Sequence, residues 1–113
     1  MDYRTILSKV IEEKRQKLIS VSDQIWGYAE TGFEEFQSAQ LLCNTLEEEG
    51  FTVEKGVGNI DTAFIGSYGT GKPIIAVLGE FDALTGLSQV GGDIQYNPEV
   101  ASGNGDGCGD TLC

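Results

Sequence analysis

The chain has 113 residues, of which 40% are hydrophobic and 22% are charged, and its formal net charge is −11. This composition is typical of a folded globular protein and argues against extensive disorder. The excess of acids makes nucleic acid and anionic membrane poor partners, because both bind clustered Lys and Arg. No apolar run approaches the roughly 18 residues that span a membrane.

The cysteine and histidine contents limit the chemistry further. The three cysteines are odd in number and follow no regular spacing, which indicates a reducing compartment rather than a disulfide framework. No signal-type segment opens the sequence, so we expect a cytoplasmic protein. The chain contains no histidine, so any catalytic proposal must do without the commonest metal ligand and general base.

Residues 3–30 are predicted to form an amphipathic helix, because their apolar side chains recur at spacings of three, four and seven. Asp2 is its expected N-cap, and Thr31-Gly32 is the expected break after it. Four basic residues on this helix are interpreted as a solvated face: Lys9, Lys14, Arg15 and Lys17.

A second helix is predicted to follow the break. Glu34 and Glu35 are placed in its first turn, where the helix dipole favours acids, and Gly50 suits the C′ position. Cys43 is interpreted as a small core residue rather than a nucleophile, because it falls on the apolar stripe. That stripe comprises Phe36, Ala39, Leu42, Cys43 and Leu46.

Three strands are predicted after the helices, at residues 51–55, 62–68 and 73–79. The stretch G-T-G-K between the last two favours a tight turn, so these two strands are predicted to pair as a hairpin. After Glu80 the periodicity is lost, and residues 83–113 are predicted to form a long glycine-rich loop. A loop of this length is usually functional or disordered.

The order of these elements predicts an α/β fold that is incomplete. The run I-I-A-V-L at 74–78 does not alternate, which suggests a central strand covered on both faces. The two helices can cover one face, and nothing left in the chain can cover the other. We therefore expect a single, incomplete domain over residues 1–113: helical over 1–50, strands over 51–82 and a site loop over 83–113.

Two motifs approach known ligand loops but lack an essential part. The stretch G-S-Y-G-T-G-K-P at 66–73 is close to a phosphate-binding loop, but Pro73 replaces the hydroxyl residue and has no backbone N–H to offer a phosphate. The tail holds the oxygen ligands Asn104, Asp106 and Asp110, yet no Glu follows at the twelfth position of a calcium loop. Neither nucleotide nor calcium binding is expected as the main role.

Two acids carry more specific chemistry. Glu80 and Asp82 lie where a buried strand is predicted to run out into a loop, which is where ligands bind in open α/β sheets. From spacing alone, a pair of solvated loop acids remains the alternative.

Four stretches together resemble one family: I-W-G-Y-A-E-T-G-F-E-E-F-Q-S-A at 25–39, E-E-E-G-F-T-V-E-K-G-V at 47–57, G-E-F-D-A-L at 79–84 and G-D-G-C-G-D at 105–110. They follow the order and separations seen in the metal-dependent amidohydrolases. That family contains aminoacylases, indole-acetyl-amino-acid hydrolases and p-aminobenzoyl-glutamate hydrolases. The match looks closest to the last branch, and it covers nearly the whole chain.

The resemblance implies a fold and an activity. Family members are several times longer, with a zinc-peptidase-type α/β/α catalytic domain and an inserted lid or dimerisation domain. They hydrolyse amide bonds of N-acyl amino acids, aminobenzoyl-glutamate or dipeptides at a pair of divalent metals, zinc or manganese, that activate a water. A glutamate further along the family chain serves as general base.

Residue roles carry over only in part. Asp82 matches the acid that orients a metal ligand across the superfamily, and Cys108 matches a metal-ligating cysteine. Glu80 falls on the same acidic pair as Asp82 and is a further candidate metal ligand. The family pattern around that cysteine is His-Gly-Cys-Gly-His, whereas Asp106 and Asp110 stand at the two histidine positions. Asp110 therefore replaces a metal ligand, and the remaining ligands and the general base have no match here.

Three interpretations follow. The first is an N-terminal part of such an amidohydrolase that is inactive alone. The second is a non-catalytic binding or regulatory module, paired with a companion chain that supplies the missing layer. The third is a weak metal-binding protein that uses Asp106, Cys108 and Asp110, whose glycine-rich loop loses entropy on ordering.

Overall fold

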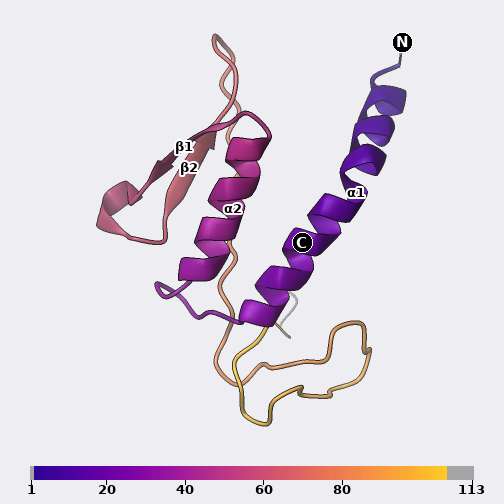
Figure 1. The fold of residues 1–113 in the computed structure, drawn as a ribbon, viewed down its shortest axis with the longest axis vertical. Coiled ribbons are helices and arrows are strands. Elements are labelled where there is room, and N and C mark those ends of the chain that lie inside the picture. Colours follow the sequence, from indigo (N-terminus) through magenta and orange to yellow (C-terminus); the bar gives the residue numbers. More distant parts are fainter. Residues whose placement is uncertain (1, 107–113) are drawn as a thin grey trace.

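The computed structural model describes residues 2–106 and shows two helices beside a small antiparallel hairpin (Figure 1). The elements in chain order are α1 (Tyr3–Tyr28), α2 (Phe36–Glu48), β1 (Thr52–Lys55), the short 3-10 helix η1 (Val57–Asn59) and β2 (Phe64–Ser67). Helix α2 lies between α1 and the hairpin. After β2, the described chain has no further helix or strand. This is an α/β arrangement, as the sequence predicts.

Helix α1 has nearly the predicted extent. The Asp2 side chain accepts a hydrogen bond from the backbone N–H of Arg4 at 3.2 Å, which confirms Asp2 as the N-cap. The helix ends at Tyr28, because Ala29 adopts a left-handed conformation with φ of 47°. No residue of α1 is buried, and its first turns stand clear of α2 (Figure 1), where Tyr3 is 81% exposed.

Helix α2 begins later than predicted. Glu34 and Glu35 precede the helix, so their placement in its first turn is wrong. The backbone donors of the first turn are satisfied from outside: the Glu30 carboxylate accepts hydrogen bonds from the N–H groups of Gln37 at 2.9 Å and Ser38 at 2.7 Å. An anion at this end of a helix also suits the helix dipole.

The end of α2 and its buried face agree with the sequence predictions. Gly50 has φ of 90°, and its N–H donates to the carbonyl of Glu47 at 3.0 Å, so it is the C′ residue that was predicted. Cys43 is 2% exposed, which confirms its place in the core. Burial raises the pKa of the Cys43 thiol, which makes it a poor nucleophile at neutral pH.

Strands β1 and β2 confirm two of the three predicted strands, each slightly shortened. They pair antiparallel, with Thr52 opposite Ser67 and Lys55 opposite Phe64. The hairpin is therefore β1 with β2, joined through η1. The predicted hairpin of residues 62–68 with residues 73–79 is wrong.

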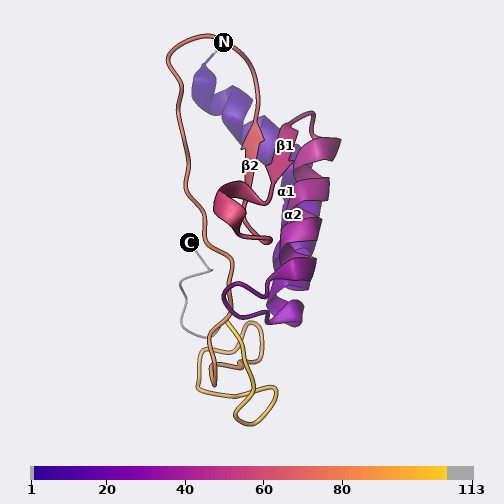
Figure 2. The same ribbon diagram turned by 90° about the vertical axis from the view of Figure 1, so that its left-hand side faces the viewer.

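Residues 73–79 do not form the predicted strand. Their apolar side chains are almost fully exposed, with Val77 at 93% and Leu78 at 92%. None of these residues makes a backbone hydrogen bond to another described residue, and Figure 2 shows much of the segment standing apart from both helices. The pattern is that of a buried central strand, but a strand forms only by pairing, and no described segment lies beside this one.

The apolar core is correspondingly small. Among the described residues, the buried hydrophobic ones are Ala39, Cys43 and Ala83. The radius of gyration is 16.0 Å, compared with about 13 Å for a compact domain of 100 residues. The described part of the chain is thus an open arrangement. None of its helices is both long and apolar enough to cross a membrane.

Candidate functional site

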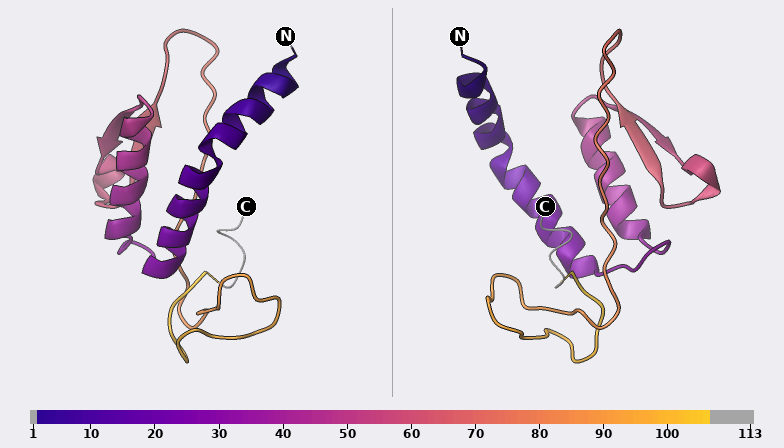
Figure 3. Two further views of the ribbon diagram at one scale, coloured as in Figure 1. Left: turned by 45° about the vertical axis from the view of Figure 1, so that its right-hand side comes forward. Right: turned by 180° about the vertical axis from the view of Figure 1, so that it is seen from behind.

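Three segments that are distant in sequence meet at one place, which we call the junction: residues 29–35 between the helices, residues 81–84 and residues 103–106. Thr31 and Ala83 form a parallel bridge, and the N–H of Ala83 donates to the carbonyl of Glu30 at 2.7 Å. Leu84 and Gly105 form an antiparallel bridge through hydrogen bonds of 2.9 and 3.0 Å. The junction lies where the end of α1 approaches the start of α2 (Figure 3).

Asp82 lies half-buried in the junction, beside the turn between the helices. A Cβ built on Gly32 would stand 3.7 Å from Asp82 Oδ2 and 3.9 Å from Glu35 Oε1, so both carboxylates face this glycine. Glu35 is 8% exposed, and its Oε1 accepts a hydrogen bond from the N–H of Phe33 at 3.0 Å. Asp82 therefore lies near a second acid, Glu35, which the sequence pattern predicts inside the second helix.

Asp106 reaches the same junction from the other side. It is 2% exposed and follows Gly105, the residue bridged to Leu84. In an antiparallel register, Asp106 therefore comes beside Ala83, the residue after Asp82. The structure thus brings two of the predicted site residues, Asp82 and Asp106, to one place.

Glu80, another predicted site residue, is not brought to the junction. Glu80 is exposed and lies on the extended segment that leads into the junction. Cys108 and Asp110 lie outside the described residues, so their role as metal ligands stays a prediction.

The described residues do not form a metal centre. Within residues 2–106, no group of three or more His, Cys, Asp or Glu side chains is arranged to hold a metal ion. The carboxylates of Glu30 and Glu35 already accept backbone hydrogen bonds of the turn and of α2. The zinc or manganese that the resemblance implies therefore finds no ligand set in this part of the chain, and no catalytic step through a metal follows from it.

The electrostatics of the turn favour an ionised Glu30. Partial burial by itself would raise the pKa of Glu30, but the backbone N–H groups of Gln37 and Ser38 stabilise the carboxylate more. The net pKa lies below its ordinary value. Glu30 therefore caps α2 as an anion at neutral pH. The two N–H donors lie seven and eight residues after Glu30 in the sequence. A local capping motif does not span that separation.

Residues 84–105 form a loop that leaves the junction and returns to it. Gln89 holds this loop internally, since its side chain donates to the carbonyl of Gln95 at 2.7 Å and accepts from the N–H of Asn97 at 3.0 Å. The indole N–H of Trp26 donates to the carbonyl of Gln89 at 3.2 Å. The single tryptophan thus connects the loop to α1 by a hydrogen bond. No local sequence pattern predicts this contact.

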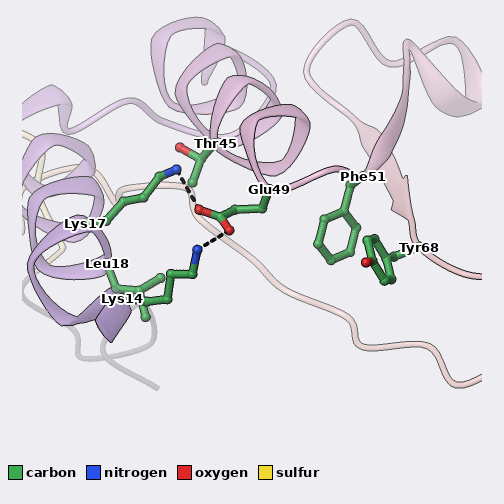
Figure 4. A pocket seen from close by; sticks show the side chains of 7 residues that line it. All are labelled: Lys14, Lys17, Leu18, Thr45, Glu49, Phe51 and Tyr68. Carbon is green, nitrogen blue, oxygen red and sulfur yellow. Dashed lines mark hydrogen bonds and ion pairs between the residues drawn. The ribbon is translucent and has the colours of Figure 1, made fainter. Parts of the chain in front are cut away.

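A pocket of about 310 Å³ lies away from the junction, between α1, the end of α2 and the hairpin (Figure 4). It is lined by Lys14, Lys17, Leu18, Thr45, Glu49, Phe51 and Tyr68. Lys14 and Lys17 both form ion pairs with Glu49. The hydrogen bond from Lys14, followed by that from Lys17, lowers the pKa of Glu49 to about 2. On the basic face of α1, Lys9 and Arg15 are exposed, and the two lysines that join the helices are partly exposed.

Known proteins match the chain over most of its length. It is 53% identical over 110 residues to a subunit of p-aminobenzoyl-glutamate hydrolase from Escherichia coli (strain K12), covering 97% of this chain and 23% of that protein. It is 31% identical over 86 residues to thermostable carboxypeptidase 1 of Saccharolobus solfataricus, covering 74% of this chain and 22% of that protein. The chain thus spans about a quarter of the length of these relatives. No family model and no solved structure matches it.

Proposed function

Because this chain belongs to the family that contains the p-aminobenzoyl-glutamate hydrolase subunit of E. coli, we propose that it is part of an enzyme that hydrolyses amide bonds. The observation that carries the proposal is the 53% identity over 97% of the chain. The two relatives are named as a hydrolase of p-aminobenzoyl-glutamate and as a carboxypeptidase. Both names describe cleavage of an amide beside an amino acid with a free carboxylate. The proposed substrates are therefore N-acyl amino acids, aminobenzoyl-glutamate and dipeptides.

Asp82 is proposed to orient a neighbouring group at the site. Its half-buried carboxylate lies beside Glu35 at the turn, and the buried Asp106 comes to the same junction. In amide hydrolysis, a water oxygen adds to the carbonyl carbon, the C–N bond breaks and the leaving nitrogen takes a proton. An acid held by a fixed backbone can keep a partner in position for such a reaction.

Cys108 and Asp110, together with Asp106, are proposed as ligands for zinc or manganese. A cysteine thiolate suits zinc, and carboxylate oxygens bind either metal. Because this segment is rich in glycine, ordering it is unfavourable in entropy and the affinity should be low. Calorimetric titration of the chain with each metal should give weak binding that Cys108→Ser abolishes. No heat with either metal would contradict this assignment.

We propose that catalysis needs further polypeptide, from a companion chain. The chain spans about a quarter of the length of its relatives, and the E. coli relative is named as a subunit, which implies a companion of its own. The chain alone should therefore show no amide hydrolysis with added zinc or manganese. Metal-dependent turnover by the chain alone, lost in Cys108→Ala, would overturn this expectation.

The test of the proposed function is a chimera in which this chain replaces the matched 110 residues of the E. coli relative. Hydrolysis of aminobenzoyl-glutamate, an N-acyl amino acid and a dipeptide is then measured. Asp82→Asn is expected to lower kcat by about 100-fold, whereas Asp61→Asn, at an exposed acid outside the junction, should leave it unchanged. Asp110→His restores the family residue and is expected to raise the activity. A chimera that stays inactive when Asp106→His and Asp110→His are combined would sink the proposal.

A non-catalytic binding or regulatory module is the second candidate. The observation in its favour is that Asp106 and Asp110 stand where the family has histidines, while the described residues hold no metal-binding group. Such a module would still associate with a companion chain but would hydrolyse none of the substrates. An active chimera with normal kcat would rule it out.

A further inference from the structure

Glu30 binds two different segments of the chain, one through its backbone and one through its side chain. Its backbone carbonyl accepts the N–H of Ala83, the residue that follows Asp82, at 2.7 Å. Its carboxylate accepts the N–H of Gln37 through Oε2 at 2.9 Å and the N–H of Ser38 through Oε1 at 2.7 Å. Glu30 therefore connects the segment that carries Asp82 to the start of α2.

The turn that contains Glu30, residues 29–35, has a backbone that needs support. Ala29 has φ of 47° and Phe33 has φ of 69°, although neither residue is glycine. Such left-handed conformations persist only where the surrounding contacts hold them. The other side-chain hydrogen bonds of the turn stay within residues 29–35. Among the described residues, the Glu30 carboxylate is thus the side-chain group of the turn that hydrogen-bonds to the backbone of α2.

We propose that Glu30 is a positioning residue, which places the Asp82 carboxylate for amide hydrolysis by holding the turn against the start of α2. Asp82 Oδ2 lies 3.7 Å from a Cβ built on Gly32, in the middle of this turn. The turn also binds the backbone of Ala83, directly after Asp82. A shift of the turn therefore changes both the surroundings of the acid and the backbone beside it. The effect on catalysis rests on the proposed function, whereas the connection from Glu30 to Ala83 does not.

Glu35 lies beside Asp82, but it does not connect the turn to α2 through its side chain. It stands at the N-cap position of α2, and its carboxylate caps no N–H of the helix. Its Oε1 accepts the N–H of Phe33 instead, which belongs to the same turn. The side-chain support that joins the turn to the helix therefore comes from Glu30.

Two substitutions at Glu30 remove this support in steps. The carboxylate has two acceptor oxygens, and each accepts one N–H of α2. Glu30→Gln offers one acceptor oxygen in place of two, and its NH₂ group then faces an N–H donor. Glu30→Ala offers no acceptor. Both variants keep the backbone carbonyl that binds Ala83, so any change at Ala83 comes through the turn.

The first measurement is amide hydrogen exchange at Ala83 in the full chain, relative to exchange at Cys43 within α2. The ratio removes the effect of a lower overall stability. We expect it to rise at least about tenfold in Glu30→Gln and further in Glu30→Ala, because a loosened turn opens the bond to Ala83 more often. Asp2→Ala is the matched control. It removes the side-chain cap of the other helix, at Arg4, and should leave the ratio unchanged.

The second measurement is kcat and KM for aminobenzoyl-glutamate in the chimera described above, corrected for the folded fraction by circular dichroism. Glu30→Gln should lower kcat about 10-fold and Glu30→Ala about 100-fold, because a displaced acid no longer holds its partner in position. KM should change by less than about twofold, since binding of the substrate itself is not removed. Asp2→Ala should change neither constant. A purely structural role for Glu30 would leave the corrected kcat of all variants equal.

Two outcomes would overturn the inference. One is an Ala83 to Cys43 exchange ratio that is the same in wild type, Glu30→Gln and Glu30→Ala. The other is a corrected kcat for Glu30→Ala that equals that of wild type in an active chimera. An inactive wild-type chimera contradicts the proposed function alone, and the exchange ratio then still decides whether Glu30 holds the segment of Asp82.

Discussion

Gly105 is the residue at which the junction tolerates no side chain. A Cβ at this position would lie 2.5 Å from the Cα of Ser88 and 2.6 Å from the carbonyl oxygen of Leu87. Both are backbone atoms, so neither can move away as a flexible side chain would. The bridge between Gly105 and Leu84, which brings Asp106 to the junction, therefore depends on glycine.

Gly105→Ala should destabilise the chain by about 1–3 kcal/mol, the usual effect of overpacking. Urea unfolding followed by Trp26 fluorescence measures this change. Gly79→Ala is the matched control, because a Cβ on Gly79 meets nothing within 4 Å. Equal midpoints for the two variants would contradict the close approach at Gly105.

For Glu30, the lowered pKa gives the direction in which this residue changes stability with pH. Its folded pKa is lower than its unfolded pKa, so its contribution to stability is present above the unfolded pKa. That contribution is lost as the pH falls through the folded pKa. Glu30→Gln should reduce the free energy of unfolding at pH 7 by about 0.5–2 kcal/mol, the range for a lost helix cap.

The measurement for Glu30 is chemical unfolding of wild type and Glu30→Gln between pH 7 and pH 3. The difference between them should shrink as the pH drops below the ordinary glutamate value of 4.5. Glu47→Gln removes an acid of α2 that caps no helix and should show no such difference at any pH. A constant gap between wild type and Glu30→Gln would speak against a charged cap.

At the scale of elements, ion pairs join α1 to the end of α2. Lys14 and Lys17 reach Glu49 at the end of α2, and Lys17 also pairs with Glu48 at 2.8 Å. The hydrogen bond with Glu48, and then that with Glu49, raises the pKa of Lys17. These groups are open to solvent, so salt should weaken them.

Glu49→Gln should lower the melting temperature slightly at neutral pH and low salt, and the effect should fade in high salt. Because the pKa of Glu49 is lowered to about 2, its stabilising effect should be lost between the ordinary value of 4.5 and about pH 2. Scanning calorimetry across this range tests the point. Glu13→Gln is the control, since the Lys9–Glu13 pair is 3.9 Å long and lies along α1 alone. A shift that is insensitive to salt and pH would argue against the interhelical pairs.

At the scale of the whole molecule, the described chain buries little and exposes one long apolar segment. Residues 73–79 combine high β propensity with exposure, a pattern that promotes self-association when no partner is present. The open shape and the three buried apolar residues among those described indicate a chain that is completed by further structure.

The isolated chain should therefore associate at high concentration, and charge in the segment should suppress this. Ile75→Lys and Val77→Lys are expected to raise the concentration at which turbidity appears, because a charge breaks the apolar run. Ile94→Lys, at another exposed isoleucine, should have a smaller effect. Equal behaviour of all three variants would show that net charge alone sets the solubility.

Sequence alone was sufficient for features that depend on near neighbours. The extent of α1, the Asp2 cap, Gly50 after α2 and the burial of Cys43 are all confirmed. Each is set by spacing or by contacts within a turn or two of helix. The family relation was also available, because it rests on motifs and not on packing, and the 53% identity confirms it. The same motifs indicate Asp82 as a site residue, which stays a prediction.

Only the tertiary structure decided which distant groups meet. It placed Glu30 under the start of α2, Glu35 beside Asp82, and Trp26 against Gln89 across 63 positions. It also paired β1 with β2 and left residues 73–79 without a neighbour among the described segments. The physical reason is common to these cases. An apolar pattern can make a segment fit to be a strand, but its hydrogen bonds must come from another segment, and a sequence pattern does not say which segment arrives.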